Sequence, residues 1–250
     1  MDPDRGSVIA VAGASGLIGS QIVRLARAAG HDVVELSRAH GVDLTQEGAL
    51  DGRLDGVAAL VDVTRSPSMD TAAATDFFTT VATNLARAAH EAGARRTVVL
   101  SIVGAEQSQD YGWYAATFAH ERTTLEHAPG PQVLRATQFH EFPGQILQRS
   151  LDGSKAAVMD WPTQPVDSAE VARQLFEMSV TDGPDVVEIA GPRRERVADL
   201  VRRLVALRGD DIEVEAVAAP ASMAGGSVLP GPGALVRGPD WDTWARAAMT

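Results

Sequence analysis

The sequence contains no cysteine, which excludes a disulfide framework and thiolate chemistry. Histidines and carboxylates remain as metal ligands, yet the six histidines, at positions 31, 40, 90, 120, 127 and 140, show no close ligand spacing. We therefore expect no metal site. Lysine is nearly absent too, since Lys155 is the only lysine among 22 basic residues. No mechanism can use a lysine anywhere else in the chain.

Excess positive charge is also missing, because the formal net charge is −11. Nucleic-acid binding needs clustered basic residues, and the one basic cluster, "RRERVADLVRRL" (193–204), mixes in acids as a solvated helix face does. No apolar run reaches the roughly 20 residues of a membrane span, and "MDPDRGS" does not resemble a signal peptide. We expect a cytoplasmic monomer or homodimer with a small-molecule substrate, and neither nucleic acid nor membrane as partner.

Strands and helices alternate in the first half of the sequence. Apolar runs predict strands, and segments with helical spacing of apolar residues follow most of them. The strands are expected at 7–13, 32–37, 57–64, 97–104 and 132–137, and the helices at 15–30, 70–93 and 113–128. This alternation predicts an α/β fold, a Rossmann-type doubly wound parallel sheet covered on both faces.

The second half is more interrupted. Helices are expected at 166–180, with Ser168 as N-cap, and at 196–209, with strands at 185–191 and 212–218. A tail rich in Gly and Pro follows at 225–249. Without a repeat or a long linker, we expect a single domain over 1–250, in which 140–165 and 185–250 form a small C-terminal substrate lobe.

The motif "GASGLIG" lies between the first strand and the first helix. Such glycines allow a tight turn and a close approach of backbone to a pyrophosphate at a helix N-terminus. The motif predicts a dinucleotide site formed by Gly13, Ser15, Gly16, Leu17, Ile18 and Gly19.

The end of the second strand suggests which dinucleotide binds. An acid there binds the ribose hydroxyls of NAD, whereas Ser37 and Arg38 occupy this position and suit a 2′-phosphate. Glu35, two residues earlier on the same face of the strand, is an acid that leaves NAD(H) as an alternative cofactor. We predict that NADP(H) is preferred.

Together these motifs resemble those of the atypical short-chain dehydrogenase/reductases, specifically the NmrA-like and isoflavone-reductase-like branch. Besides the glycine motif, the resemblance rests on "GVDL" (41–44), "VVLSIVG" (98–104), "VLRATQFHEF" (133–142) and "QPVDSAEVARQL" (164–175). It implies an NAD(P)H-dependent oxidoreductase in which Asp43 and Leu44 contact the adenine, and Val63 and Thr64 belong to the cofactor-facing loop after the third strand.

The family's catalytic dyad is incomplete in this sequence. Ser101 matches the serine that ends the fourth strand, but Tyr-x-x-x-Lys places either Thr117 after Trp113 or Phe118 after Tyr114 at the lysine position. An unassisted phenol has a pKa of about 10. Tyr114 could therefore orient a carbonyl but would protonate it poorly.

Other side chains could supply the missing proton. His140 follows the fifth strand at the ligand edge of the sheet and has suitable acid–base chemistry, although a structural role at a helix start is an equal alternative. His120 is a weaker candidate, seven residues beyond Trp113. We predict catalytic roles for His140, Tyr114 and Ser101. The predicted substrate-facing residues are Trp113, Thr117 and Phe139.

Three functions remain open from these residues. The first is an NADPH-dependent reductase of a quinone-like, enone or aromatic polyketide-like compound of secondary metabolism, since such acceptors need little help from an acid. The second is a non-redox isomerase, dehydratase or cyclase on the same scaffold. The third is a regulatory protein that senses the NADP(H) redox state without catalysis.

Overall fold

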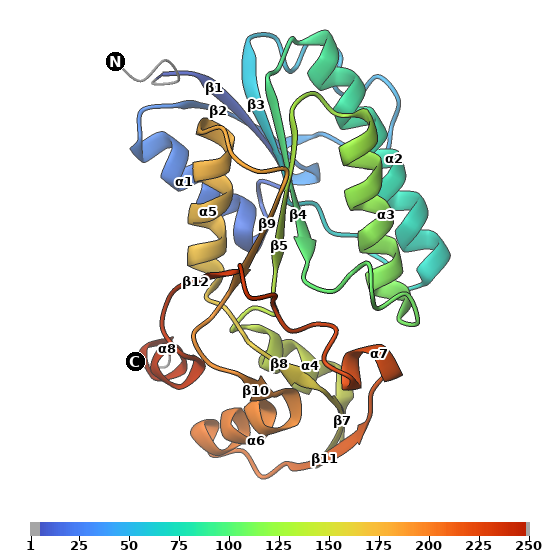
Figure 1. The fold of residues 1–250 in the computed structure, drawn as a ribbon, viewed down its shortest axis with the longest axis vertical. Helices are drawn as coiled ribbons and strands as arrows, with labels where there is room; N and C mark the ends of the chain where they lie inside the picture. Colours follow the sequence, from blue (N-terminus) through green and yellow to red (C-terminus); the bar gives the residue numbers. More distant parts are fainter. Residues whose placement is uncertain (1–5, 249–250) are drawn as a thin grey trace. The chain divides into compact units, whose positions relative to one another are not determined.

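The computed structural model describes residues 6–248 (Figure 1). They form two compact units, which we describe separately. The first unit falls within residues 1–101, 112–135 and 171–187, and the second within 102–111, 136–170 and 188–250.

A seven-stranded parallel sheet, with strand order β12-β9-β5-β4-β3-β1-β2, confirms the predicted Rossmann-type α/β fold. Its strands are β1 (Val8–Ala12), β2 (Asp32–Leu36), β3 (Val57–Asp62), β4 (Arg96–Ile102), β5 (Pro131–Ala136), β9 (Val186–Ala190) and β12 (Leu235–Val236). In β1, Ala12 pairs with Leu36 on one side and with Asp62 on the other. The strand order reverses beside β1, so the carboxyl ends of β1 and β3 flank the point where open α/β sheets bind ligands.

Helices cover both faces of the first unit's strands. Figure 1 shows α1 (Leu17–Ala28) and α5 (Ser168–Val180) on one face, with α2 (Thr71–Glu91) and α3 (Gly112–His127) on the other. Helix α1 buries Ile18 and Ile22, one turn apart, and the chain leaves the helix through Gly30 at φ 87°. Asp70 caps α2 by accepting the Ala73 N–H over 2.9 Å.

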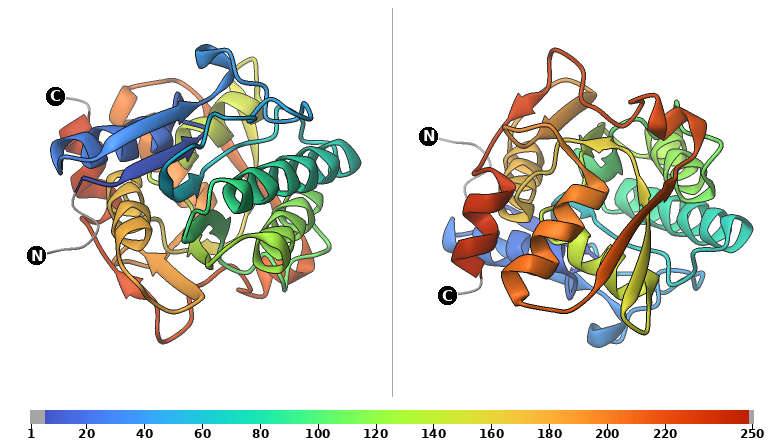
Figure 2. Two further views of the ribbon diagram at one scale, coloured as in Figure 1. Left: turned by 90° about the horizontal axis from the view of Figure 1, so that it is seen from above. Right: turned by 90° about the horizontal axis from the view of Figure 1, so that it is seen from below.

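The second unit contains a small sheet of order β11-β7-β6. Its elements are α4 (Phe142–Ser150), β6 (Leu151–Asp152), β7 (Lys155–Asp160), β8 (Pro162–Thr163), β10 (Glu195–Arg196), α6 (Val197–Arg208), β11 (Glu213–Ala218), α7 (Ala221–Ala224) and α8 (Trp241–Ala248). Helices α4 and α6 contact β7, whose Ala156 and Val158 are fully buried. The right panel of Figure 2 shows α6 beside β11 and β7.

The structure corrects the sequence-based assignment at two places. Ser168 is the first residue of α5 and donates to Glu141, while the preceding Asp167 accepts the Ala169 N–H over 3.0 Å, so Ser168 is not the N-cap. The sequence also gave no sign of α4 at 142–150. Pro143 and Gly144 lie in its first turns, where proline is tolerated but helical spacing is hard to recognise.

Candidate functional site

The glycine turn is packed so closely that side chains cannot replace its hydrogens. Gly13 has φ 83°, and a Cβ there would lie 2.8 Å from the Val63 carbonyl oxygen. A Cβ on Gly19 would lie 2.2 Å from the Gly13 oxygen. The Gly13 N–H donates to the Leu36 oxygen over 2.9 Å. The turn is thereby held against the ends of both strands that neighbour β1.

Helix α1 begins at this turn without a capping side chain. Gly16 is its N-cap and has no side chain with which to cap the helix, and the first turn contains no acid. Ser15, Gly16 and Leu17 are exposed, whereas Ile18 and Gly19 are buried. Uncapped N–H groups at an exposed helix start suit a pyrophosphate. The arrangement fits the predicted dinucleotide, with Ile18 and Gly19 limited to backbone and packing roles.

Ser37 and Arg38 lie at the carboxyl end of β2. Ser37 is buried and its hydroxyl lies 2.8 Å from His40 Nδ1, while Arg38 is exposed at the start of the 3₁₀ turn Arg38–His40. The carboxylate of Glu35 lies 2.6 Å from Arg27 and 3.4 Å from His40. Glu35 is therefore already paired with a guanidinium.

The two residues of the expected adenine contact differ in their surroundings. Asp43 is exposed, and hydrogen bonds from the side chain and backbone of Thr45 hold its pKa below the ordinary value. Leu44 is buried in the hydrophobic core beside β1 and β3, and its carbonyl accepts from Asn84 over 2.9 Å. The Leu44 side chain thus contributes to folding, and Asp43 offers the accessible polar group.

A buried, hydrogen-bonded His–Asp pair lies at the start of the loop after β3. His120 Nε2 is 2.8 Å from Asp62 Oδ2, and both side chains are only 2% exposed. The other oxygen of Asp62 accepts the Thr64 N–H over 2.9 Å. Burial opposes ionisation of Asp62, but the charge and hydrogen bond of His120, together with Thr64, lower its pKa. The Thr64 hydroxyl is buried and has no hydrogen-bond partner among residues 6–248.

Helix α3 carries the residues expected at the incomplete dyad. Tyr114 is 4% exposed, and Thr117 uses its hydroxyl to donate to the Trp113 carbonyl over 2.9 Å. Trp113 is half-buried, with its ring centroid 5.7 Å from that of Phe78. The only lysine, Lys155, lies on β7 in the second unit and pairs with Glu213 over 2.8 Å. No lysine therefore belongs to α3.

Ser101 is part of a second buried network in the first unit. Its hydroxyl donates to Glu121 Oε2 over 2.8 Å, and the Arg135 Nε donates to the same oxygen over 3.1 Å. A second Arg135 nitrogen binds the other carboxylate oxygen, giving a bidentate pair. Ser101 and Glu121 are 2% and 1% exposed. The serine hydrogen is thus directed at a carboxylate that also ties α3 to β5.

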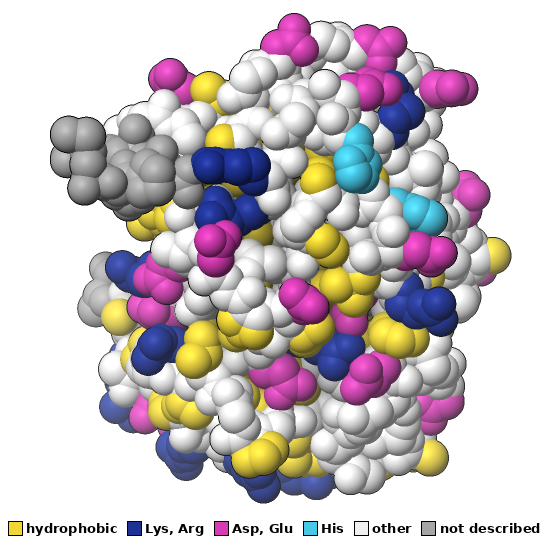
Figure 3. Space-filling model, turned by 45° about the horizontal axis from the view of Figure 1, so that its top comes forward, with side chains coloured by type: hydrophobic (Ala, Val, Ile, Leu, Met, Phe, Trp, Pro, Cys, Tyr) yellow, Lys and Arg dark blue, Asp and Glu magenta, His cyan; other side chains and the backbone are white. Residues whose placement is uncertain are grey.

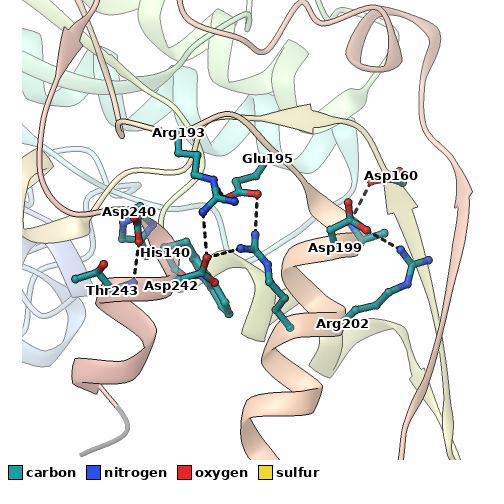
Figure 4. A network of polar contacts seen from close by, with 12 residues as sticks. His140, Asp160, Arg193, Glu195, Asp199, Arg202, Asp240, Asp242 and Thr243 are labelled. Atoms are coloured by element: carbon teal, nitrogen blue, oxygen red, sulfur yellow. Dashed lines mark hydrogen bonds and ion pairs between the residues drawn. The ribbon is translucent and has the colours of Figure 1, made fainter.

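His140 belongs to the second unit, and Figure 4 shows it beside Asp240 of the C-terminal segment. Its Nε2 lies 3.1 Å from the Pro239 carbonyl oxygen, and its own carbonyl accepts from the Trp241 indole over 3.0 Å. Burial lowers the pKa of His140. Its Nδ1 is buried without a partner among the described residues. A ring that donates from Nε2 and has no partner at Nδ1 is neutral. These contacts favour a structural role for His140. The catalytic role remains a prediction.

Phe139, expected to face the substrate, is half-buried and forms an isolated parallel bridge with Val166 in the second unit.

Of the predicted site residues, the structure brings Gly13, Ser37, Val63 and Thr64 together around the end of β1. Sequence reasoning missed the partners of the buried polar groups, namely Asp62, Glu121 and Arg135. Asp62 carried a usable signal, since an acid inside the apolar run "VAALVDV" requires a buried partner.

No group of three or more His, Asp or Glu side chains among the described residues could hold a metal ion. None of the helices in residues 6–248 is long and apolar enough to cross a membrane. On the face drawn in Figure 3, acidic and basic side chains are interspersed, and no extended basic patch occurs there.

Comparison with known proteins agrees with this geometry. Residues 9–129 match the model of the NAD dependent epimerase/dehydratase family. Among solved structures, MoeE5 in complex with UDP-glucose and NAD is 18% identical, with 98% of this chain and 100% of that chain covered and a TM-score of 0.73.

Two further structures resemble the chain over nearly its whole length. TunA, an NAD dependent NDP-hexosamine 5,6-dehydratase involved in tunicamycin biosynthesis, is 15% identical, covers 96% and 95% of the two chains and has a TM-score of 0.75. WbmG of Bordetella bronchiseptica, in complex with NAD, is 17% identical and has a TM-score of 0.75, with 99% of this chain and 95% of that chain covered. No curated protein matches the chain.

The solved structures share the Rossmann-type fold of this chain, and the family match covers the glycine turn. Residues 9–129 are thus similar to the NAD dependent epimerase/dehydratase family, in line with the predicted superfamily over that part of the chain. The NmrA-like branch stays a prediction.

Proposed function

We propose that the protein is an NADPH-dependent reductase of small acceptors that stabilise negative charge themselves, such as a quinone, an enone or an aromatic polyketide-like compound. The observation that carries this proposal is the absence of lysine from α3, combined with the engagement of the Ser101 hydroxyl by Glu121. A conjugated acceptor needs no strong acid at the moment of hydride transfer, because its charge delocalises.

The same observation argues against chemistry at a sugar alcohol. MoeE5 and TunA are described with sugar nucleotides, and oxidising a hydroxyl requires a base that removes its proton. Tyr114 has no lysine beside it in the helix to make its phenol such a base. A bound nicotinamide would supply a hydride, two electrons with one proton. A second proton from water would complete the reduction of a quinone to a quinol.

The preference for NADP(H) rests on the end of β2. Arg38 is exposed beside the buried Ser37, and both suit a 2′-phosphate. Glu35 is paired with Arg27, which weakens the case for its binding the ribose hydroxyls of NAD. Arg38→Ala should weaken NADPH binding about tenfold and change NADH binding less than about twofold. Isothermal titration calorimetry with both dinucleotides measures this, and an equal loss for both would refute the preference.

Turnover should be tested by following NADPH absorbance at 340 nm with a quinone, an enone and a simple ketone. We expect oxidation with the first two and little with the ketone. Tight NADPH binding without turnover of any acceptor would overturn the proposal. Release of a rearranged or dehydrated product without net NADPH consumption would indicate the non-redox alternative.

A second candidate, a protein that binds NADP(H) without catalysis, has support from one observation. Both hydroxyls expected in catalysis are buried, with Ser101 2% and Tyr114 4% exposed. Such a sensor must bind the two oxidation states with different affinities, because a ligand with equal affinity for two states shifts neither. Equal dissociation constants for NADP+ and NADPH would exclude it.

A further inference from the structure

The loop 62–65 after β3 is held by helix α3 at its beginning. Asp62 uses Oδ1 for the Thr64 N–H at 2.9 Å and Oδ2 for His120 at 2.8 Å. A buried ion pair contributes little net stability, because removing two charges from water costs about as much as their attraction returns. Such a pair mainly fixes the geometry of the groups that bind to it. In this structure it fixes the backbone N–H of Thr64, which donates to Asp62.

The same helix also holds the end of this loop. The Arg65 guanidinium lies 5.9 Å from the centroid of the Trp113 ring, and Trp113 precedes His120 by about two turns of α3. Trp113 meets Phe78 edge-on at 5.7 Å, and Phe78 stacks on His120 at 4.7 Å with an interplanar angle of 18°. Contacts therefore run in a closed circuit from the loop through α3 and α2 and back to Asp62.

The loop so held forms one wall of the glycine turn. The Val63 N–H donates to the Ala12 oxygen over 3.0 Å, and its carbonyl oxygen occupies the space that a Cβ on Gly13 would need. A shift of Val63 would therefore move the turn. Thr64, the next residue, has a buried hydroxyl that makes no hydrogen bond of ordinary geometry among the described residues, although it lies close enough to Asp62 to help lower the pKa of that carboxyl.

We propose that His120 is a positioning residue for the dinucleotide, which acts through Asp62 to fix Val63 and Thr64 against the glycine turn. This inference rests on the proposed dinucleotide-binding function. His120 does not touch the ligand. It lowers the cost of binding because the loop is already in its bound conformation before the dinucleotide arrives.

The test compares dinucleotide affinity with stability in matched variants. Asp62→Asn keeps the shape of the side chain and removes its charge, and His120→Leu removes the hydrogen bond. We expect each to raise the dissociation constant for NADPH about tenfold, measured by calorimetry at a temperature where the variant is fully folded. His120→Gln, which keeps an N–H donor, should restore at least half of the lost affinity on a logarithmic scale.

His31→Gln is the control. His31 is a second buried histidine of the same unit, 9% exposed, with its ring 5.7 Å from Phe176 and its Nδ1 3.1 Å from the Ser7 hydroxyl. His31 directly precedes β2, at the amino ends of the strands, whereas the glycine turn lies at their carboxyl ends. The His31→Gln variant should have a lower unfolding midpoint and a dissociation constant for NADPH within twofold of the unaltered protein. Unchanged affinity in Asp62→Asn and His120→Leu, with lowered midpoints, would show that the pair is only structural.

A measurement on the unaltered protein covers the case in which these variants do not fold. The Thr64 amide should exchange slowly with deuterium before ligand is added, and NADPH should change its exchange rate less than about threefold. Fast exchange that slows only with NADPH would contradict a preformed loop. If the unaltered protein binds neither NADPH nor NADH, the proposed function fails, whereas binding with an unprotected Thr64 amide refutes only the role of His120.

Discussion

Ser101 donates its hydroxyl hydrogen to Glu121 over 2.8 Å, inside the first unit and out of contact with solvent. The carboxylate receives Arg135 as well, so one acid joins β4, α3 and β5. A serine bound in this way has a lone pair to offer a ligand but no free hydrogen. Together with the absence of lysine from α3, this bound hydroxyl is the basis for our proposal of an easily reduced acceptor.

Glu121→Gln tests how much this network stabilises the fold. The amide cannot form the bidentate pair, and it leaves the nearly buried Arg135 charge without its counter-ion. We expect the free energy of unfolding to fall by about 3 kcal/mol, measured by urea denaturation. The exposed acid Glu91, which pairs with Arg87 on the surface of α2, is the control. Glu91→Gln should cost less than about 0.5 kcal/mol, and equal losses would contradict the account.

Gly19→Ala tests the packing of the glycine turn. The added Cβ would lie 2.2 Å from the Gly13 oxygen, and backbone on both sides must shift. We expect a loss of stability of about 1–3 kcal/mol and a rise of more than tenfold in the dissociation constant for NADPH. Gly233 has open space around its added Cβ. Gly233→Ala should leave both quantities nearly unchanged, and a tolerant Gly19→Ala would show that the turn does not need its glycines.

Thr64→Val tests whether the unpartnered hydroxyl serves the dinucleotide. Valine keeps the shape, so stability should stay the same or rise, because an unsatisfied buried hydroxyl is removed. The dissociation constant for NADPH should rise about five- to tenfold, equivalent to one hydrogen bond of about 1 kcal/mol. Thr97, near the amino end of β4, also has a buried hydroxyl without a partner among residues 6–248. Thr97→Val should not change affinity, so a similar loss in both variants would speak against a ligand contact.

His140 should make stability depend on pH. Burial lowers its pKa in the folded protein, so the unfolded chain binds the proton more readily. Its contribution to stability is present above about pH 6.5 and decreases as the pH falls towards the folded pKa. The decrease should reach at most about 1.4 kcal/mol per pH unit.

The comparison with His140→Gln isolates this contribution. Below about pH 6.5, urea denaturation of the unaltered protein should show a steeper loss of stability with falling pH than the variant. The exposed His127 serves as control, and His127→Gln should keep the full slope. Parallel curves for the unaltered protein and His140→Gln would contradict a neutral, buried imidazole.

The sequence predicted the sheet, its main helices and the glycine turn, because apolar periodicity and glycine spacing are local signals. Helix α4 escaped prediction because Pro143 and Gly144 obscure its start. The pairs His120–Asp62 and Ser101–Glu121 were not predicted, since they join positions 58 and 20 residues apart. Such partners come together only when strands and helices pack, and a single sequence does not indicate which polar side chain will pair with which.

Transfer of deuterium from NADPH labelled at nicotinamide C4 to a quinone or enone is the most direct test of the central claim. The account predicts label in the reduced enone, or stoichiometric NADP+ and quinol with a primary isotope effect on the rate. NADPH that binds but passes neither label nor electrons to any conjugated acceptor would contradict it.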